Sequence, residues 1–221
     1  MNIFDILGPV MVGPSSSHTA GAVRIGLMAR KLLGAPLREA QILLHGSFAA
    51  TGKGHGTDRA LVAGLLGMEP DDMRIPDSFS AAREAGLLFS FGTVELKGAH
   101  PNTAVLKVKG IHGESLTMQA SSLGGGRIMI DKLDGMEVKC SCGCPTLVVY
   151  NLDQPGCVAQ VTSHLFDQRI NIANMSLYRN KKGGQAVMIL ELDQEVPASF
   201  LKWLKTLPGV ERSIYIQAGG S

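Results

Sequence analysis

One stretch of the chain, residues 45–58, gathers the kinds of side chain that transfer protons and bind charged ligands. It reads H-G-S-F-A-A-T-G-K-G-H-G-T-D and combines two histidines, a lysine, an aspartate and three hydroxyl residues with four glycines. The glycines around Lys53 and His55 allow positive φ and a close approach of the backbone to a ligand. Packing alone does not require this composition, so the stretch is predicted to line a small-molecule site.

A second polar loop, residues 13–19, has the same character. It reads G-P-S-S-S-H-T and precedes a helical pattern that ends near Gly34. Serine hydroxyls and backbone N–H groups at a helix N-terminus suit an anion such as a carboxylate. An N-cap needs one hydroxyl, whereas this loop supplies four and an imidazole, so a ligand site is favoured over simple capping. We expect the two loops to face each other across one site.

The elements that would position the first stretch are a strand at residues 40–44 and a helix that begins near Thr57. This order must be compared with the nucleotide-binding P-loop pattern, G-x-x-x-x-G-K-[S/T]. Here five residues separate Gly46 from Gly52, and Gly54 stands where the pattern has the hydroxyl that binds magnesium. The spacing and the metal ligand are both wrong, so a P-loop is excluded.

Four cysteines raise the question of a metal or cluster site. Three form C-x-C-x-C, at Cys140, Cys142 and Cys144, and the fourth is Cys157. In a strand the three thiols would share one face, but zinc and iron–sulfur sites more often use C-x-x-C loops. Reduced strand thiols in a cytosolic protein are the favoured interpretation, with metal coordination as the alternative. No metal-binding residue is assigned.

Length and composition indicate a globular protein of one large domain or two small ones. The chain has 221 residues, 45% of them hydrophobic and 18% charged, which is enough apolar sequence to bury a core. A formal net charge of +2 gives no electrostatic basis for binding nucleic acid or a membrane surface. The apolar run at residues 3–12 is too short to span a bilayer and lacks the charge of a signal peptide. A cytoplasmic location is therefore expected.

Residues 89–140 consist of short β-rich segments separated by glycines and turns, which predicts an antiparallel sheet packed by the preceding helices. Two polar loops lie between these segments, H-P-N-T at residues 100–103 and S-S-L-G-G-G at residues 121–126. Three consecutive glycines do not suit a strand interior and indicate a bulge or a loop close to a ligand.

Pro145 marks a boundary, because the pattern after it is strand–helix–strand–strand–helix–strand. That order predicts a ferredoxin-like βαββαβ unit, with the K-K-G-G sequence at residues 181–184 as its hairpin turn. The predicted fold class is therefore α+β. It has an N-terminal α/β sandwich-like domain at residues 1–144 and the ferredoxin-like domain at residues 146–221.

The C-terminal segment resembles an ACT domain, a small module by which metabolic enzymes sense amino acids. The resemblance rests on N-L-D-Q-P-G at residues 151–156 and on R-I-N-I-A-N at residues 169–174. It implies an effector site near the first strand–helix turn, often between two modules, and hence an ACT-mediated homo-oligomer. The residues implied in effector binding are Asn151, Asp153, Pro155, Gly156 and Asn171. A structural dimerisation module that binds nothing is the alternative.

The four N-terminal motifs, in their order and followed by the ACT-like segment, resemble the beta chain of bacterial iron–sulfur-dependent L-serine dehydratase. The similarity spans essentially the whole chain and implies an N-terminal domain of the allosteric-substrate-binding type. That family deaminates L-serine to pyruvate and ammonia without pyridoxal phosphate. The resemblance implies an alpha-chain partner holding a [4Fe–4S] cluster, one iron of which acts as a Lewis acid on the serine hydroxyl.

In that reaction a base must remove the α-proton of serine near neutral pH, and imidazole suits this role. His55 is expected to be the base or proton shuttle, with His18 assisting it or orienting the substrate. The candidates for holding the serine carboxylate and ammonium are Ser15, Ser16, Ser17, Thr19, Thr51, Gly52 and Lys53. Two alternatives stay open: Lys53 pairs with Asp58, and His45 is a structural hydrogen-bonding group.

The hydroxyl of serine is a poor leaving group unless a metal takes it, so the partner is expected to supply the iron. A monovalent cation is a second cofactor left open. A function of a different class also stays open: a regulatory module that senses serine and contains no catalytic residue. A His55→Ala variant distinguishes these functions, since it lowers turnover in the first case and shifts only the serine dependence in the second.

Overall fold

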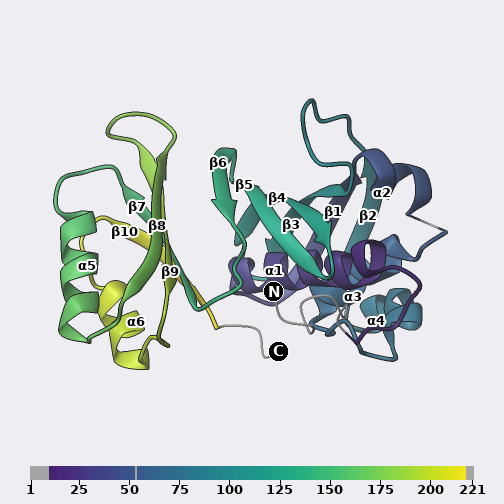
Figure 1. The fold of residues 1–221 in the computed structure, drawn as a ribbon, viewed down its shortest axis with the longest axis horizontal. Helices are drawn as coiled ribbons and strands as arrows, with labels where there is room; N and C mark the ends of the chain where they lie inside the picture. The colour runs from purple at the N-terminus through teal and green to yellow at the C-terminus, as the bar shows by residue number, and fades with distance from the viewer. Residues whose placement is uncertain (1–9, 53, 218–221) are drawn as a thin grey trace. The chain divides into compact units, whose positions relative to one another are not determined.

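The computed structural model describes residues 10–52 and 54–217. Lys53 and most of the apolar run at residues 3–12 therefore lie outside the described residues. The chain divides into two compact units, Met1–Ser141 and Cys142–Ser221 (Figure 1). Each unit has its own sheet together with helices, which confirms the α+β prediction.

The first unit is built on a six-stranded sheet with the order β2-β1-β3-β4-β5-β6. The strands are β1 (Leu37–Leu44), β2 (Leu88–Thr93), β3 (Thr103–Gly110), β4 (Ser115–Gly124), β5 (Arg127–Leu133) and β6 (Met136–Cys140). Neighbouring strands are antiparallel, except that β1 and β2 are parallel. Ala40, Ile42 and Leu44 alternate along β1 and are buried, so the short predicted strand becomes a central strand of the sheet.

The helices of the first unit pack in succession. They are α1 (Gly21–Leu33), α2 (Gly46–Thr51), α3 (Thr57–Leu66) and α4 (Ser78–Glu84), with a π-helical turn η2 (Ser16–Ala20) and a 3-10 turn η3 (Ile75–Asp77). α1 packs against β3, β4 and β5, α3 packs against α1, and α4 packs against α3. Gly34 and Gly67, with φ of 66° and 93°, end α1 and α3. Within the described residues, no helix is long and apolar enough to cross a membrane.

Helices α1 and α3 cross at two glycines. A Cβ on Gly26 would lie 2.3 Å from Leu61 O, and a Cβ on Gly64 would lie 2.0 Å from Val23 O. Both distances are far below van der Waals contact, so only glycine lets the two backbones approach this closely. Because each polar loop leads into one of these helices, the crossing fixes the separation of the loops.

The stretch at residues 45–58 is not one open loop, as the sequence suggested, because it contains the short helix α2. Gly46 has φ of 54°, and a Cβ on it would lie 2.6 Å from Pro101 O. The chain turns at this glycine, and the fully buried Phe48 anchors the helix that follows. The expectation was wrong because the contact that sets the turn comes from a segment distant in the sequence.

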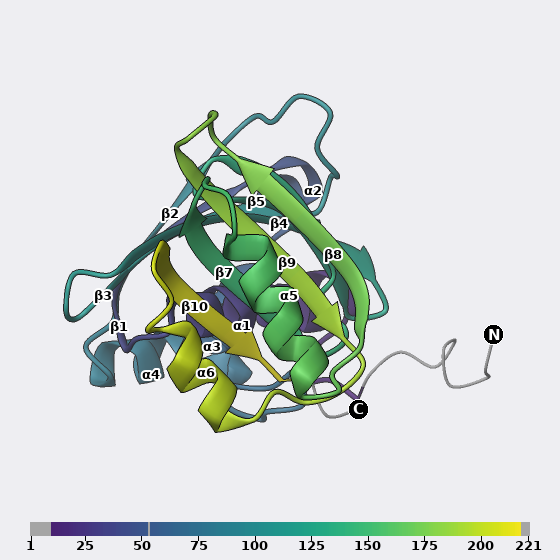
Figure 2. The same ribbon diagram turned by 90° about the vertical axis from the view of Figure 1, so that its left-hand side faces the viewer.

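The second unit is a four-stranded antiparallel sheet with the order β10-β7-β9-β8. Its elements are β7 (Thr146–Leu152), α5 (Cys157–Asp167), β8 (Ile172–Arg179), β9 (Gln185–Leu192), α6 (Ala198–Leu204) and β10 (Val210–Ile216). This is the ferredoxin-like arrangement of a βαββαβ chain, so that prediction is confirmed. Helices α5 and α6 cover the same face of the sheet (Figure 2).

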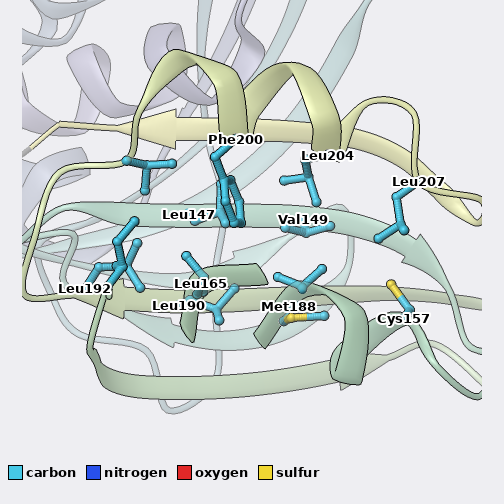
Figure 3. Packing of buried hydrophobic residues seen from close by; sticks show 13 residues of the cluster. Leu147, Val149, Cys157, Leu165, Met188, Leu190, Leu192, Phe200, Leu204 and Leu207 are labelled. Atoms are coloured by element: carbon cyan, nitrogen blue, oxygen red, sulfur yellow. The ribbon is translucent and has the colours of Figure 1, made fainter. Parts of the chain in front are cut away.

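The core of the second unit lies between that face and the two helices. Figure 3 shows Phe200 and Leu204 of α6 pointing toward Leu147 and Val149 of β7, and none of the four is more than 1% exposed. Burying each such side chain contributes about 1.5–3 kcal/mol. The predicted hairpin turn at residues 181–184 is closed by a hydrogen bond, which Gly184 N donates to Lys181 O at 3.0 Å.

Candidate functional site

The two polar loops of the first unit meet. His18, in η2, lies beside α2, where its Nε2 is 3.1 Å from Thr51 Oγ1 and 3.2 Å from Ser47 Oγ. Its ring also packs edge-on against Phe48, with ring centroids 5.3 Å apart. The expected meeting of the loops is confirmed, and Ser47, which sequence reasoning did not select, takes part in it.

His55 lies next to His18, with ring centroids 4.9 Å apart and ring planes tilted by 40°. It follows α2 in the chain, and its Nδ1 is 3.2 Å from Thr51 O. A cleft of about 460 Å³ is lined by Val12, Gly13, Pro14, Thr19, Gly54, His55, Gly56, Asp58, Arg59, Ile75, Pro76 and Phe79. Residues of both polar loops therefore border one cleft, and His55 is the imidazole in its wall.

The electrostatics of this pair favour an uncharged His18. Partial burial, and after it the positive charge of a protonated His55, lower the pKa of His18 from its ordinary value of 6.5. The two rings lie too close to be protonated together without repulsion. His18 is therefore neutral near pH 7 and carries one ring proton.

Ser15 has the capping role that the sequence analysis weighed against ligand binding. It is the N-cap of η2, and its Oγ accepts a hydrogen bond from His18 N at 3.2 Å. The same oxygen lies 3.4 Å from His18 Nδ1. Ser15 thus begins the helical turn and also contacts the imidazole that the turn carries.

The glycine triplet of the S-S-L-G-G-G motif closes against the first polar loop. Ser16 Oγ accepts a hydrogen bond from Gly125 N at 3.3 Å, and a Cβ on Gly124 would lie 3.5 Å from Ser17 Oγ. All three glycines have positive φ, between 61° and 87°, so the chain turns here with its backbone N–H groups near the serines. Gly125 and Gly126 form a tight turn between β4 and β5, and the register shifts between Ser122 and Gly124, so a bulge and a turn are confirmed here. The expected loop is wrong for residues 121–124, which belong to β4.

Each of the four polar motifs holds one buried oxygen without a hydrogen-bond partner among the residues that the structure describes. These atoms are Thr19 Oγ1, Thr57 Oγ1, Asn102 Oδ1 and Ser122 Oγ. Buried polar atoms nearly always have a partner, so these four oxygens are candidates for contacts with a bound ligand. Sequence reasoning quoted the motifs of Asn102 and Ser122 but selected neither residue, because nothing in the sequence shows which polar atom becomes buried.

Gly52 and Lys53, which follow α2, are two of the residues that the sequence predicts to hold the substrate. Gly52 is the C-cap of α2, and a Cβ on it would lie 2.2 Å from Phe48 O, so helix packing accounts for this glycine. Lys53 lies outside the described residues, and its proposed contact with substrate or with Asp58 stays a prediction. Asp58 itself, in the first turn of α3, accepts a hydrogen bond from Arg59 N at 2.8 Å.

His45 stands at the end of β1 in a structural position. Its Nδ1 lies 3.2 Å from Val94 O and 3.3 Å from Leu96 N, and its backbone N–H donates to Thr103 O at 3.0 Å. These contacts join three segments of the first unit, so they favour the structural alternative for this histidine.

Only the first cysteine of the C-x-C-x-C segment belongs to a strand. Cys140 ends β6, but Cys142 has φ of 49°, so the interpretation as strand thiols is right for Cys140 and wrong for Cys142 and Cys144. None of the four cysteines forms a disulfide. In the described ranges, residues 10–52 and 54–217, no three His, Cys, Asp or Glu side chains are grouped to hold a metal ion.

In the second unit, the turn between β7 and α5 gathers most of the expected effector residues. Asn151 is 3% exposed; its Nδ2 donates to Leu152 O at 2.7 Å, and its Oδ1 has no partner within the described part of the chain. The carboxylate of Asp153 accepts from Gly183 N and Arg179 Nη1, both at 2.9 Å. These donors, Gly183 first, lower the pKa of Asp153. Pro155 and Gly156 precede α5, and Gly156 has φ of 99°.

Asn171 lies at the opposite end of the same sheet. It precedes β8, and its Nδ2 donates to Asp193 Oδ2 at 2.6 Å. The register pairs the adjacent Ile172 with Leu192, at the far end of β9 from the Ala186 that pairs with Asn151. Within one copy of the chain, Asn171 is therefore not brought to the other effector residues.

Comparison with known proteins finds similarity over most of the chain. A family model described as serine dehydratase beta chain matches residues 2–88. The probable L-serine dehydratase, beta chain, of Bacillus subtilis is 40% identical over 209 residues, covering 95% of this chain and 94% of that protein. The L-serine dehydratase, beta chain, of Peptoniphilus asaccharolyticus is 39% identical over 210 residues, with 95% and 93% covered. A D-3-phosphoglycerate dehydrogenase of Methanocaldococcus jannaschii is 34% identical over 83 residues, which are 38% of this chain and 16% of that protein.

Proposed function

Because the chain belongs to the family of L-serine dehydratase beta chains, we propose that it is a subunit of an enzyme that deaminates L-serine to pyruvate and ammonia. The observation that carries the proposal is the pair of imidazoles, His18 and His55, with ring centroids 4.9 Å apart. His55 of this pair lines a cleft that both polar loops border. A regulatory module that only binds serine would need the cleft but not a second imidazole beside it.

The reaction needs two different tasks to be done. Serine loses its α-proton and its β-hydroxyl, together one water, and the resulting enamine takes water back and releases ammonia to give pyruvate. We assign removal of the α-proton to His55, because imidazole transfers protons near neutral pH. We assign His18 to orienting the substrate and His55, since hydroxyls on α2 hold its ring.

The carboxylate and ammonium of serine are proposed to lie between the loops. The residues assigned to hold them are Ser15, Ser16, Ser17, Thr19, Thr51, Gly52 and Lys53. Support is strongest for Thr19, which lines the cleft and has a buried Oγ1 without a partner among the described residues. It is weakest for Ser15 and Gly52, whose positions are also explained by helix capping.

The described residues of this chain do not fit an iron–sulfur cluster, because they include no group of suitable donors. We therefore assign the [4Fe–4S] cluster to an alpha-chain partner, in keeping with the beta-chain names of the relatives. When bound there, the cluster would supply an acceptor for the leaving hydroxyl. This chain is proposed to hold the substrate and to transfer its α-proton.

The second unit is proposed to be an ACT-type sensor of an amino acid. Its ferredoxin-like strand order and the buried Asn151 Oδ1 support this assignment. Since Asn171 lies at the other end of the sheet, we place the effector between two copies, with Asn151, Asp153, Pro155 and Gly156 from one copy and Asn171 from the other. As part of the same proposal, the protein acts in the cytoplasm, where its four thiols stay reduced.

The test is pyruvate formation from L-serine under anaerobic conditions, measured on this chain alone and on the complex with its co-expressed partner. Activity only in the complex with an iron-containing partner supports the two-chain enzyme. A coloured and active isolated chain would place the cluster here and overturn the assignment to the partner. Serine binding without activity in either preparation would favour the regulatory module.

A further inference from the structure

Thr51, the last residue of α2, contacts both imidazoles of the site through two different atoms. Its hydroxyl oxygen lies 3.1 Å from His18 Nε2, and its carbonyl oxygen lies 3.2 Å from His55 Nδ1. The two oxygens differ in what they can do, since a hydroxyl donates or accepts a hydrogen bond and a carbonyl only accepts. Counting the protons at these atoms therefore assigns the protonated nitrogen of each ring.

The hydroxyl of Thr51 has one proton, and that proton is already used. Thr51 Oγ1 donates to Ser47 O at 2.9 Å, the carbonyl one helical turn earlier. Toward His18 the same oxygen can only accept, so His18 Nε2 must carry the ring proton. Ser47 Oγ lies 3.2 Å from the same nitrogen and can share that one proton as a second acceptor.

The other nitrogen of His18 agrees with this assignment. In a neutral ring protonated at Nε2, Nδ1 has a lone pair and accepts. Ser15 Oγ lies 3.4 Å from Nδ1 and already accepts from His18 N at 3.2 Å, which leaves its own proton to donate to the ring. Both nitrogens of His18 are therefore committed to neighbouring hydroxyls.

His55 is assigned by the backbone of Thr51. Because a carbonyl only accepts, His55 Nδ1 must carry the proton that it donates to Thr51 O. The lone pair of the neutral ring is then on Nε2. This is the state in which an imidazole accepts a proton from a substrate.

We infer that Thr51 is a positioning residue that assigns the ring protons of both histidines, to Nε2 of His18 through its hydroxyl and to Nδ1 of His55 through its carbonyl. The consequence for catalysis rests on the proposed function, but the proton assignment does not. One residue thereby keeps His18 as a fixed hydrogen-bonded group and His55 as a base with its lone pair on Nε2.

The two contacts can be separated, because a side-chain substitution removes one of them and keeps the other. Thr51→Val is nearly isosteric and removes only the hydroxyl, whereas Thr51→Ser keeps it. The matched control is Thr162→Val, since Thr162 Oγ1 also donates to a carbonyl one turn earlier, Val158 O at 3.0 Å, in the other unit. The Thr162→Val control removes the same kind of helical hydroxyl at a position far from His18 in the chain.

The direct measurement is the ring ¹⁵N spectrum of the full chain labelled with ¹⁵N-histidine, recorded near neutral pH and assigned with His18→Gln and His55→Gln. We expect the named tautomers of His18 and His55 to exceed the alternatives by about tenfold, the effect of one hydrogen bond. In Thr51→Val, His18 should become a mixture of tautomers while His55 is unchanged, and Thr51→Ser and Thr162→Val should match the wild type. A wild-type His18 protonated at Nδ1, or a His55 protonated at Nε2, would overturn the inference even if no variant folds.

Turnover by the complex with the partner chain supplies a second readout. Thr51→Val should lower kcat about tenfold or more, since a displaced imidazole costs rate, and Thr51→Ser, which keeps the hydroxyl proposed to hold serine, should restore both kcat and KM. The expected tautomers in a complex that does not deaminate serine would refute the proposed function and leave the proton assignment intact. An active complex whose Thr51→Val variant has wild-type tautomers would refute the positioning role alone.

Discussion

The rings of His18 and His55 lie with centroids 4.9 Å apart, although α1, β1 and α2 separate them in the chain. The two imidazoles are not equivalent. His18 has hydroxyl oxygens next to both of its nitrogens, from Ser15 on one side and from Ser47 and Thr51 on the other. His55 uses Nδ1 for a backbone carbonyl, which leaves the lone pair of its neutral ring on Nε2. This difference supports the proposed roles, with His18 as the positioning group and His55 as the proton acceptor.

Removing the imidazole of His55 should abolish most of the turnover. In the complex with its partner, His55→Ala is expected to lower kcat at saturating L-serine by about 10²–10⁴-fold, the usual contribution of a general base. Anaerobic pyruvate formation measures it. The control is His112→Ala, which removes an exposed histidine of a turn and should leave kcat unchanged. A His55→Ala complex that only needs more serine to reach the wild-type kcat would favour the regulatory function.

Stability should decrease as the pH falls through 6.5, the ordinary pKa of a histidine, because burial and His55 hold the pKa of His18 below that value. At a pH between the lowered pKa of His18 in the folded chain and its ordinary pKa in the unfolded chain, the unfolded chain binds a proton that the folded chain does not. The free energy of unfolding therefore decreases as the pH is lowered through this range. Well above pH 6.5 the His18 imidazole is neutral in both the folded and the unfolded chain, so this loss of stability is absent. Urea unfolding at about pH 7.5 and about pH 5.5 tests this in the wild type and in His18→Gln. Equal losses of stability in the two proteins would contradict the assignment to His18.

The position of α2 should depend on the absence of a side chain at Gly46. Gly46→Ala combines positive φ with a Cβ placed 2.6 Å from Pro101 O, so it is expected to destabilise the protein by about 1–3 kcal/mol beyond the strain of φ itself. Gly98→Ala is the matched control, because Gly98 has φ of 74° and no heavy atom within 4 Å of its added Cβ. It should cost only about 1 kcal/mol. Similar urea midpoints for the two variants would show that the backbone near Pro101 shifts to accommodate the added Cβ without a further loss of stability.

Effector binding at the second unit should depend on Asn151. Its buried Oδ1 has no partner among the described residues, so Asn151→Ala is expected to weaken binding by about tenfold or more, the cost of one buried hydrogen bond. Calorimetric titration of the full chain with L-serine measures this, with Asn174→Ala, an exposed asparagine of β8, as control. Unchanged titration curves for both variants would show that Asn151 does not contribute to L-serine binding.

Much of the architecture could be predicted from the sequence. The second unit followed from its alternating strands and helices, because each local pattern there agrees with the tertiary fold. The meeting of His18 with residues 45–58 followed from the clustering of polar groups, which packing does not require. Helix α2 and Ser47 were missed because Pro101, whose backbone sets the turn at Gly46, comes from a later loop. The buried oxygens of Asn102 and Ser122 were missed for the same reason, since burial is decided by segments distant in the sequence.

The glycine crossing of α1 and α3 determines when the site exists during folding. The two helices have no side chain between them at Gly26 and Gly64, so their backbones fit together only after both helices have formed. His18 leads into one helix and His55 into the other, and the contacts of His18 with Ser47 and Thr51 join segments about 30 residues apart in the chain. We therefore expect docking of the helix pair, a long-range event, to be the step that brings the two imidazoles together. A chain in which these helices are not docked is expected to lack the site, so recovery of the His18–His55 contact should report on completed folding of this unit.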